Sequence, residues 1–343
     1  METKKGSLID QFKNKKTLVT GGTGTIGGAI VDRLLTYHNP EVVRVLSNDE
    51  YSMFDMQQRF GDIDTIRYLI GDIRDEKRMV QATDDIDIVF HCGAMKHVPF
   101  CEYNPMDAIQ TNIIGTNNVI TASLQNGIEK MITISTDKAV NPTNTMGATK
   151  LLTEKLTVDA NFIKGNRKTI FCCVRFGNVI ISRGSVIDIF KKQSKEKNTI
   201  PVTEPGMTRF VMSSSDSVDL IFKSTEMTKG GEIFILKMPS VTVGDLSDAF
   251  IEKELEQNKT KIEKHFIGIR PGEKFHEELM TDVESTNAFE TKDMFIVFPQ
   301  ISESREKPKL SDYKGATKCK PMVYDSYKCK KLNKNEIKKL IPI

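Results

Sequence analysis

Short apolar runs alternate with amphipathic segments through the first half of the chain. The segment 26–37 has the spacing of an amphipathic helix, and runs typical of buried strands occur at 17–20, 42–46, 66–70, 86–90, 131–134 and 170–174. Strands of this length separated by helices indicate a parallel sheet with right-handed crossovers. The pattern therefore predicts an α/β protein with a Rossmann-type, doubly wound parallel sheet.

The pattern changes after about Val179, where proline, glycine and serine become more frequent and strands such as 233–236 stand among loops. This change predicts a smaller C-terminal, substrate-binding lobe that closes on the carboxyl edge of the sheet. We expect residues 1–178, with returning segments near 205–240, to form the Rossmann domain. Residues 179–301 are expected to form the discontinuous lobe. The lysine-rich extension 302–343 carries no predicted element.

Composition limits the possible partners and location. The 343 residues are 38% hydrophobic and 28% charged with a net charge of +3, which is ordinary for a globular protein and predicts no nucleic-acid partner. The six cysteines show neither disulfide nor zinc-site spacing, and no metal site is predicted. The chain has no signal-peptide pattern and no run of about 18 apolar residues, so we expect a cytoplasmic protein without membrane insertion.

A glycine-rich turn follows the first predicted strand and precedes the first predicted helix. Glycines in this context let the backbone approach a pyrophosphate at a helix N-terminus, which predicts a dinucleotide site. Its residues are Gly21, Thr23, Gly24, Thr25, Ile26 and Gly27.

Polar residues at the ends of the next strands extend this predicted site. Ser47, Asn48 and Asp49 end the second strand, and Asp72 and Ile73 follow a later one, where they suit an adenine-edge contact. An acidic residue here binds the ribose of NAD, whereas an adjacent Arg or Lys would accept the 2′-phosphate of NADP. Asp49 lies one or two residues beyond the expected position and no basic residue is adjacent, so both cofactors stay open.

Several longer strings carry a family resemblance. They are 91–99 (HCGAMKHVP), 111–116, 135–142 (STDKAVNP), 174–179, 182–185 (SRGS), 207–210 (MTRF) and 270–274 (RPGEK). From about residue 14 to 280 the chain resembles the UDP-N-acetylglucosamine 4,6-dehydratases of the extended short-chain dehydrogenase/reductase superfamily. The resemblance implies a UDP-N-acetylhexosamine substrate, a 4-keto-6-deoxy product, a nicotinamide cofactor regenerated in each turnover, and a homo-oligomer, either a dimer or a hexamer.

The resemblance also implies roles for the residues of these strings. Lys150 would hold the nicotinamide ribose, with Ala94 beside the cofactor, while Met146 stands where the superfamily normally has a tyrosine that exchanges a proton. Methionine cannot do this. The proton chemistry would then fall to Thr136 at the C4 oxygen, Asp137 as acid at C6 and Lys138 as base at C5. Burial and neighbouring cations are expected to lower the pKa of Lys138 enough for that role.

Cations and amide groups are expected to bind the nucleotide sugar. The resemblance assigns the sugar or diphosphate to Lys96 and Asn178, and the pyrophosphate side to Arg209 and Arg270. Further substrate-binding candidates are His97, Arg183, Ser185, Thr203 and Glu273.

Two other functions compete with the dehydratase. A C4-epimerase of the same superfamily would need neither an acid at C6 nor a base at C5, and a non-catalytic nucleotide sensor would not need Asp137, Lys138 and Lys150 together. Retention or inversion at C5 stays open, although the lack of membrane segments favours inversion.

Overall fold

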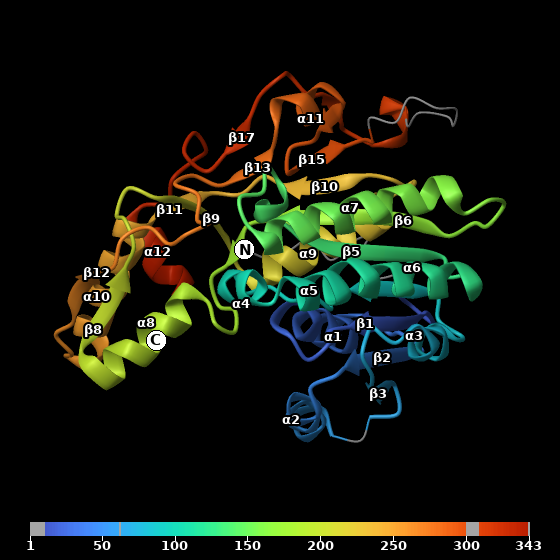
Figure 1. Cartoon of the computed structure of the whole chain (residues 1–343), viewed down its shortest axis with the longest axis horizontal. Coiled ribbons are helices and arrows are strands. Elements are labelled where there is room, and N and C mark those ends of the chain that lie inside the picture. Colours follow the sequence, from blue (N-terminus) through green and yellow to red (C-terminus); the bar gives the residue numbers. More distant parts are fainter. Residues whose placement is uncertain (1–10, 62, 300–308, 342–343) are drawn as a thin grey trace.

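The computed structural model describes residues 11–61, 63–299 and 309–341 and is built around a ten-stranded sheet (Figure 1). The strand order is β16-β14-β15-β10-β6-β5-β4-β1-β2-β3. The strands from β10 to β3 in this order run parallel: β1 (Lys16–Thr20), β2 (Val42–Ser47), β3 (Ile66–Ile70), β4 (Ile88–His91), β5 (Lys130–Thr136), β6 (Ile170–Phe176) and β10 (Ile233–Leu236). The order 3-2-1-4-5-6 is that of a doubly wound Rossmann sheet, so the predicted fold class is confirmed.

Apolar side chains on both sides of the sheet explain why the helices cover it. On α1 (Thr25–Tyr37), the buried residues Gly27, Ile30, Val31 and Leu34 recur every three or four positions and form one apolar stripe. α1 contacts α9 (Ser214–Met227), whereas α3 (Glu76–Thr83), α6 (Gly115–Gln125) and α7 (Thr145–Ile163) pack against one another. The remaining helices of this part are α2 (Glu50–Phe60), α4 (Val98–Tyr103), α5 (Pro105–Ala108), a π-helical turn (Ile109–Ile114) and a 3-10 turn, η2 (Asp137–Ala139).

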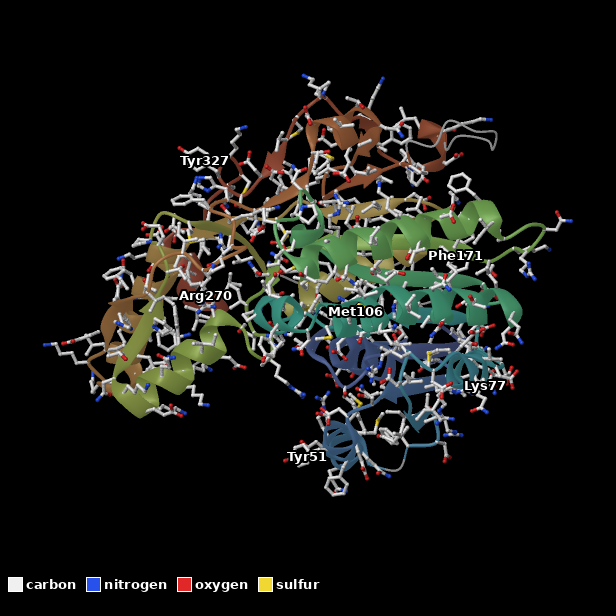
Figure 2. The ribbon with its side chains drawn as sticks, in the orientation of Figure 1. Tyr51, Lys77, Met106, Phe171, Arg270 and Tyr327 are labelled. Carbon is white, nitrogen blue, oxygen red and sulfur yellow. The ribbon has the colours of Figure 1, made fainter. Side chains whose placement is uncertain are left out.

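A smaller lobe with its own core lies beside the carboxyl ends of the parallel strands (Figures 1 and 2). It contains α8 (Val186–Lys197), α10 (Val243–Asn258) and the parallel pair β8 (Thr199–Val202) and β12 (Glu263–Phe266). β9 (Thr208–Met212) joins β7 (Asn178–Val179) to β11 (Ser240–Thr242) in a three-stranded sheet. Phe190 and Phe250 pack 5.4 Å apart at the centre of the lobe. Arg270 lies among the side chains of this lobe in Figure 2.

The last third of the chain differs from the sequence-based expectation. The segment 288–297, expected in the lobe, forms β14 (Ala288–Glu290) and β15 (Met294–Val297) of the main sheet, because every side chain of β15 is buried there. After residue 308, where no element was expected, the chain forms a 3-10 turn (Leu310–Asp312), β16 (Thr317–Lys318), β17 (Tyr324–Asp325) and α12 (Lys334–Leu340). β17 pairs with β13 (Glu278–Met280), which precedes α11 (Asp282–Thr286). The expected extension also includes 302–308 and 342–343, which lie outside the described residues.

Isolated apolar side chains explain these C-terminal elements. Tyr313, Cys319, Tyr324 and Ile337 are buried, although lysines surround them in the sequence. α12 packs on α10, with Ile337 in the core of the lobe. A lysine-rich segment can therefore be ordered where single apolar residues reach an existing core.

Candidate active site

A cleft of about 1150 Å³ lies between the carboxyl ends of the parallel strands and the lobe. Such a position, where the strand order reverses between β1 and β4, is where doubly wound sheets bind ligands. The cleft brings together every site residue proposed from the sequence except Asp137: Gly21, Thr23, Gly24, Thr25, Ile26, Gly27, Ser47, Asn48, Asp49, Asp72, Ile73, Ala94, Lys96, His97, Thr136, Lys138, Met146, Lys150, Asn178, Arg183, Ser185, Thr203, Arg209, Arg270 and Glu273.

The glycine-rich turn forms one end of the cleft and has the geometry of a pyrophosphate cradle. Gly21 has φ +61°, and a Cβ on it would meet Gly93 Cα at 2.8 Å. A Cβ on Gly27 would meet the Gly21 carbonyl oxygen at 2.4 Å, so only glycine lets α1 start this close to β1. Gly24 caps α1 without a side-chain hydrogen bond, which leaves the amides of the first helical turn available to an anion.

Charged residues at the ends of β2 and β3 form the neighbouring part of the cleft. Asp49 caps α2 and accepts a hydrogen bond from the Ser52 amide at 3.0 Å. Arg183, far away in the sequence, donates to Ser52 Oγ at 3.0 Å and lies 3.8 Å from Asp49 Oδ2. Arg74 pairs with Asp72 at 2.6 Å. The structure thus places Arg183 beside Asp49, although no basic residue is adjacent to Asp49 in the sequence, and Arg74 beside Asp72.

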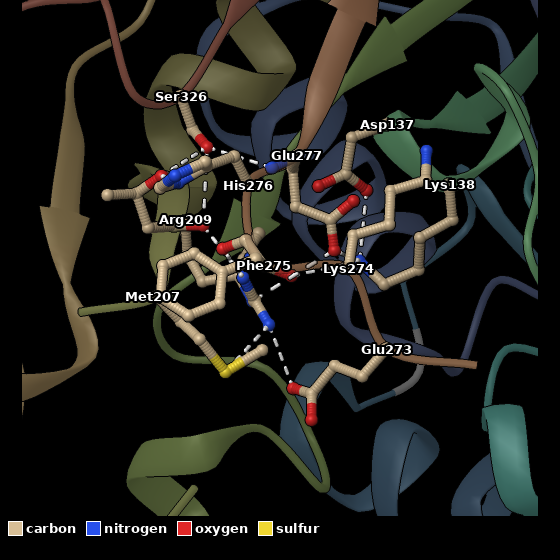
Figure 3. Close-up of polar contacts among 12 residues, drawn as sticks. Asp137, Lys138, Met207, Arg209, Glu273, Lys274, Phe275, His276, Glu277 and Ser326 are labelled. Atoms are coloured by element: carbon tan, nitrogen blue, oxygen red, sulfur yellow. Dashed lines mark hydrogen bonds and ion pairs between the residues drawn. The ribbon is translucent and has the colours of Figure 1, made fainter. Parts of the chain in front are cut away.

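The end of β5 carries the proposed catalytic residues, and Figure 3 shows them beside a glutamate that sequence reasoning missed. Asp137 is fully buried; its Oδ1 accepts hydrogen bonds from Thr136 Oγ1 at 2.8 Å and from Lys138 Nζ at 3.0 Å. Lys138 Nζ also lies 3.4 Å from Asn178 Oδ1 and 3.8 Å from Glu277 Oε1. Glu277 lies beyond the 270–274 string in the sequence, and only the fold brings it to Lys138.

The pKa of Lys138 contradicts the sequence-based expectation. Burial alone would lower this pKa, but the carboxylates of Asp137 and Glu277 outweigh burial, so the pKa of Lys138 is raised above its ordinary value. Burial does lower the pKa of Lys150, whose Nζ donates to the Ile134 carbonyl at 2.6 Å. Lys138 is therefore a cation at neutral pH in this site, and a cationic amine cannot accept a proton.

Met146 lies on the first turn of α7, one helical turn before Lys150. It is 4% exposed and belongs to a small apolar cluster with Cys101 and Ala108, against which Met95 and Val98 pack. Its side chain therefore forms an apolar part of the cleft wall.

Basic and polar residues from the lobe and from the segment that follows β4 line another part of the cleft. Arg209 donates to Glu273 Oε1 at 2.9 Å and lies 3.9 Å from Glu277 Oε1, whereas Arg270 is exposed. Lys96 donates to the Arg183 carbonyl at 2.6 Å, and burial lowers its pKa. Ser185 caps α8 by accepting from the Asp188 amide. His97 and Thr203 complete this wall.

Within 11–61, 63–299 and 309–341, no group of three His, Cys, Asp or Glu side chains has an arrangement that would hold a metal ion. No helix in the same residues is long and apolar enough to cross a membrane.

Comparison with known proteins places the chain among nucleotide-sugar enzymes. It is 43% identical over 291 residues to the UDP-N-acetylglucosamine 4,6-dehydratase (inverting) of Campylobacter jejuni, which covers 84% of each chain. It is also 37% identical to the UDP-glucose 4-epimerase of Rickettsia rickettsii and 47% identical to an uncharacterized membrane protein of Methanocaldococcus jannaschii, each over 96% of both chains.

Solved structures and a family profile agree with this placement. The X-ray structure of Pen from Bacillus thuringiensis has a TM-score of 0.89 and 46% sequence identity, with 96% of this chain and 98% of that chain covered. The profile of the family described as "Polysaccharide biosynthesis protein" matches residues 17–299. The chain therefore belongs to the polysaccharide biosynthesis protein family, within the extended short-chain dehydrogenase/reductase fold.

Proposed function

We propose that this protein is a UDP-N-acetylglucosamine 4,6-dehydratase that forms a UDP-2-acetamido-2,6-dideoxy-4-hexulose with inversion at C5. The observation that carries the proposal is the Thr136–Asp137–Lys138 cluster at the end of β5, in the same cleft as Lys150 and the glycine-rich turn. An enzyme that acts only at C4 needs one group that accepts the proton of the C4 hydroxyl. It needs no additional carboxyl or ammonium group. The Campylobacter jejuni relative named as an inverting dehydratase supports the same function.

The residues of the cleft fit a bound NAD or NADP. The amides at the start of α1 would hold the pyrophosphate, Lys150 the nicotinamide ribose, and Ser47, Asn48, Asp49 and Asp72 the adenosine side. When bound, the nicotinamide would take a hydride from C4 and return it to C6. Because the cofactor is regenerated in each turnover, a tightly held cofactor suits the reaction.

Thr136 and Asp137 provide a path for the first proton without a tyrosine. Asp137 does not line the cleft, and we route its proton exchange with the sugar through Thr136 Oγ1, which lines the cleft and lies 2.8 Å from its Oδ1. We assign the C4 hydroxyl proton to this pair. The same proton then protonates the departing C6 hydroxyl, so Asp137 serves both steps and returns to its starting state.

The lobe would bind the UDP portion. Arg209 and Arg270 would hold the diphosphate, and Lys96, Asn178, Arg183 and Glu273 would contact the sugar or the neighbouring phosphate. His97, Ser185 and Thr203 lie on the same wall and would complete the pocket. The assembly is proposed to be a homo-oligomer, either a dimer or a hexamer.

A C4-epimerase is the second candidate, because the Rickettsia rickettsii relative carries that name. The buried Asp137 and Lys138 disfavour it, since an epimerase needs proton transfer only at the C4 oxygen. A nucleotide-binding sensor without activity would require no such cluster either.

Incubation with UDP-N-acetylglucosamine separates the three functions. A dehydratase gives a product that has lost one water by mass spectrometry, an epimerase gives an isomer of equal mass, and a sensor leaves the substrate unchanged. UDP-glucose serves as the control substrate. NMR in deuterated water then shows whether C6 is a methyl group, as return of the hydride requires, and which configuration C5 has. A product that has lost water without gaining a 6-methyl group would contradict the full reaction.

A further inference from the structure

Glu277 is a buried carboxyl at the catalytic end of the cleft that the sequence-based mechanism does not use. It directly precedes β13, is 2% exposed and lines the cleft. Its Oε1 lies 3.8 Å from Lys138 Nζ and 3.9 Å from Arg209 Nε. Its Oε2 is buried and has no hydrogen-bond partner among the described residues. A buried carboxyl oxygen without a partner is costly in a folded protein, and such groups often mark a functional site.

Asp137 differs from Glu277 in its access to the cleft. Both side chains approach the same ammonium group, and Figure 3 shows the two carboxyls next to each other near the end of the Lys138 side chain. Asp137 Oδ1 is engaged by Thr136 and Lys138, and Asp137 lies behind the cleft wall. In the part of the chain that the structure describes, Glu277 Oε2 has no hydrogen-bond partner, and Glu277 lies at the wall itself. Of the two carboxyls, Glu277 is therefore the one that can meet a sugar carbon.

The surrounding charges suit Glu277 to accept a proton. Burial, together with the negative charge of Asp137, raises the pKa of Glu277 against the opposing pull of Lys138, Arg209 and Lys274. A raised pKa makes the carboxylate a stronger base than an exposed glutamate. Lys138 is cationic beside it, so the neutral amine that a lysine base requires is not the resting form.

We propose, on the basis of the dehydratase function above, that Glu277 is the catalytic base that removes the C5 proton. After oxidation at C4, the C5–H bond breaks and its proton forms an O–H bond with the Glu277 carboxylate. The C5 electron pair forms the C5=C6 double bond as the C6–O bond breaks. The departing oxygen takes the proton that Asp137 received from the C4 hydroxyl and leaves as water.

Lys138 then has a role that its positive charge permits. The ammonium would stabilise negative charge that develops on the C4 oxygen during loss of the C5 proton. Inversion requires that the proton return to C5 from a second group, and Lys138 can donate it as hydride reaches C6. Lys138 then recovers a proton from Glu277, 3.8 Å away, so that both groups end in their starting forms.

The test compares Glu277→Gln with Glu278→Gln in the cofactor-bound, full-length protein. Glutamine keeps the size of the side chain but cannot accept a proton at neutral pH. Glu278 is the matched control because it is the next residue, binds Asn141 Nδ2 at 2.6 Å and does not line the cleft. We expect Glu277→Gln to lower kcat by about 10²–10⁴-fold, the range for a lost general base, and Glu278→Gln to leave kcat within about threefold.

Two further readouts identify the step. In a single turnover, Glu277→Gln should still reduce the bound nicotinamide, because oxidation at C4 precedes proton loss at C5, and C5 should not exchange hydrogen with deuterated water. Glu277→Asp, which keeps a carboxyl, should recover part of the rate. In the wild-type protein kcat should fall as the pH drops through the raised pKa of Glu277, since the protonated carboxyl cannot accept a proton. Glu277→Asp should shift the pH at which kcat falls.

The outcomes separate this inference from the proposed function. If the wild-type protein releases no dehydrated sugar, the proposed function fails. If the wild-type protein is active while Glu277→Gln turns over at near wild-type rate, or exchanges C5 hydrogen normally, Glu277 is not the base. A Glu277→Gln protein that retains its cofactor but cannot reduce it would also overturn the inference, because the block would precede the C5 step.

Discussion

Replacing Asp137 by asparagine tests the assignment of the first proton. The side chain keeps its size and can still accept a hydrogen bond from Thr136, 2.8 Å away, but it can no longer carry a proton. A lost general acid or base costs about 10²–10⁴-fold in rate, or about 3–5 kcal/mol of barrier. We expect ketosugar formation to fall by that factor while the cofactor stays bound, because Asp137 does not line the cleft.

The substitution also changes the electrostatics of Lys138, and this change can be measured separately. Asp137 lies 3.0 Å from Lys138 Nζ, but Glu277 remains 3.8 Å away, so the ammonium keeps one partner. The stability loss should therefore be about 1–3 kcal/mol, below the 3–5 kcal/mol of a fully broken buried pair. Stability from a raised lysine pKa is present at neutral pH and is lost as pH rises through the folded-state pKa. In Asp137→Asn this alkaline loss should begin at a lower pH.

Product formation by mass spectrometry, bound cofactor by absorbance and urea unfolding across pH provide the three measurements. Asp159→Asn is the control, since Asp159 is an exposed carboxylate on the same chain and does not line the cleft. Residual turnover within tenfold of wild type would refute the route through Thr136 and Asp137. An unchanged alkaline unfolding profile would refute the argument about Lys138.

Three further substitutions test other parts of the site. Gly27→Ala should abolish cofactor retention, because its Cβ would lie 2.4 Å from a carbonyl oxygen, whereas Gly28→Ala, with its nearest neighbour at 3.6 Å, should retain the cofactor absorbance. Met146→Tyr should give no gain in kcat and a stability loss of about 1–3 kcal/mol by overpacking, and a gain above tenfold would show that a tyrosine is what the site lacks. Glu154→Gln should lower the urea-unfolding free energy by about 3 kcal/mol, because Glu154 pairs with the buried Arg175 at 2.6 Å; an unchanged midpoint would contradict that assignment.

The sequence was a good guide to the fold where apolar residues lie next to one another. The runs at 17–20 and 131–134 became β1 and β5, each buried as a block, and the run at 42–46 became β2, in which Val43, Val45 and Leu46 are buried. It was a poor guide after residue 308, where a few apolar residues among many lysines enter a core. Ile337, Leu340 and Ile341 have helical spacing and reach the core of the lobe, but this pattern is short and stands among lysines, so it gave no prediction of a helix.

The candidate site shows the same division between local and spatial information. The glycine-rich turn is a local arrangement, and its spacing sufficed to place it at a helix N-terminus. The pKa of Lys138 is raised by its sequence neighbour Asp137 and by Glu277, which only the fold brings near, so the sequence-based expectation of a lowered pKa was wrong. Arg183 likewise lies near Asp49 only because of the fold, whereas Arg74 is close to Asp72 in the sequence as well.

Met146 is compatible with catalysis once the protons are counted. The reaction releases one proton from the C4 hydroxyl and one from C5, and it uses one at C6 and one at C5. Asp137 can take up the C4 proton and give it back at C6, while Glu277 takes up the C5 proton and Lys138 returns one to C5; both carboxyls lie within 3.8 Å of the Lys138 ammonium. A tyrosine at position 146 would be an additional carrier with no proton left to move. The requirement at that position reduces to an apolar side chain that keeps water from the cleft wall, and a methionine that is 4% exposed meets it.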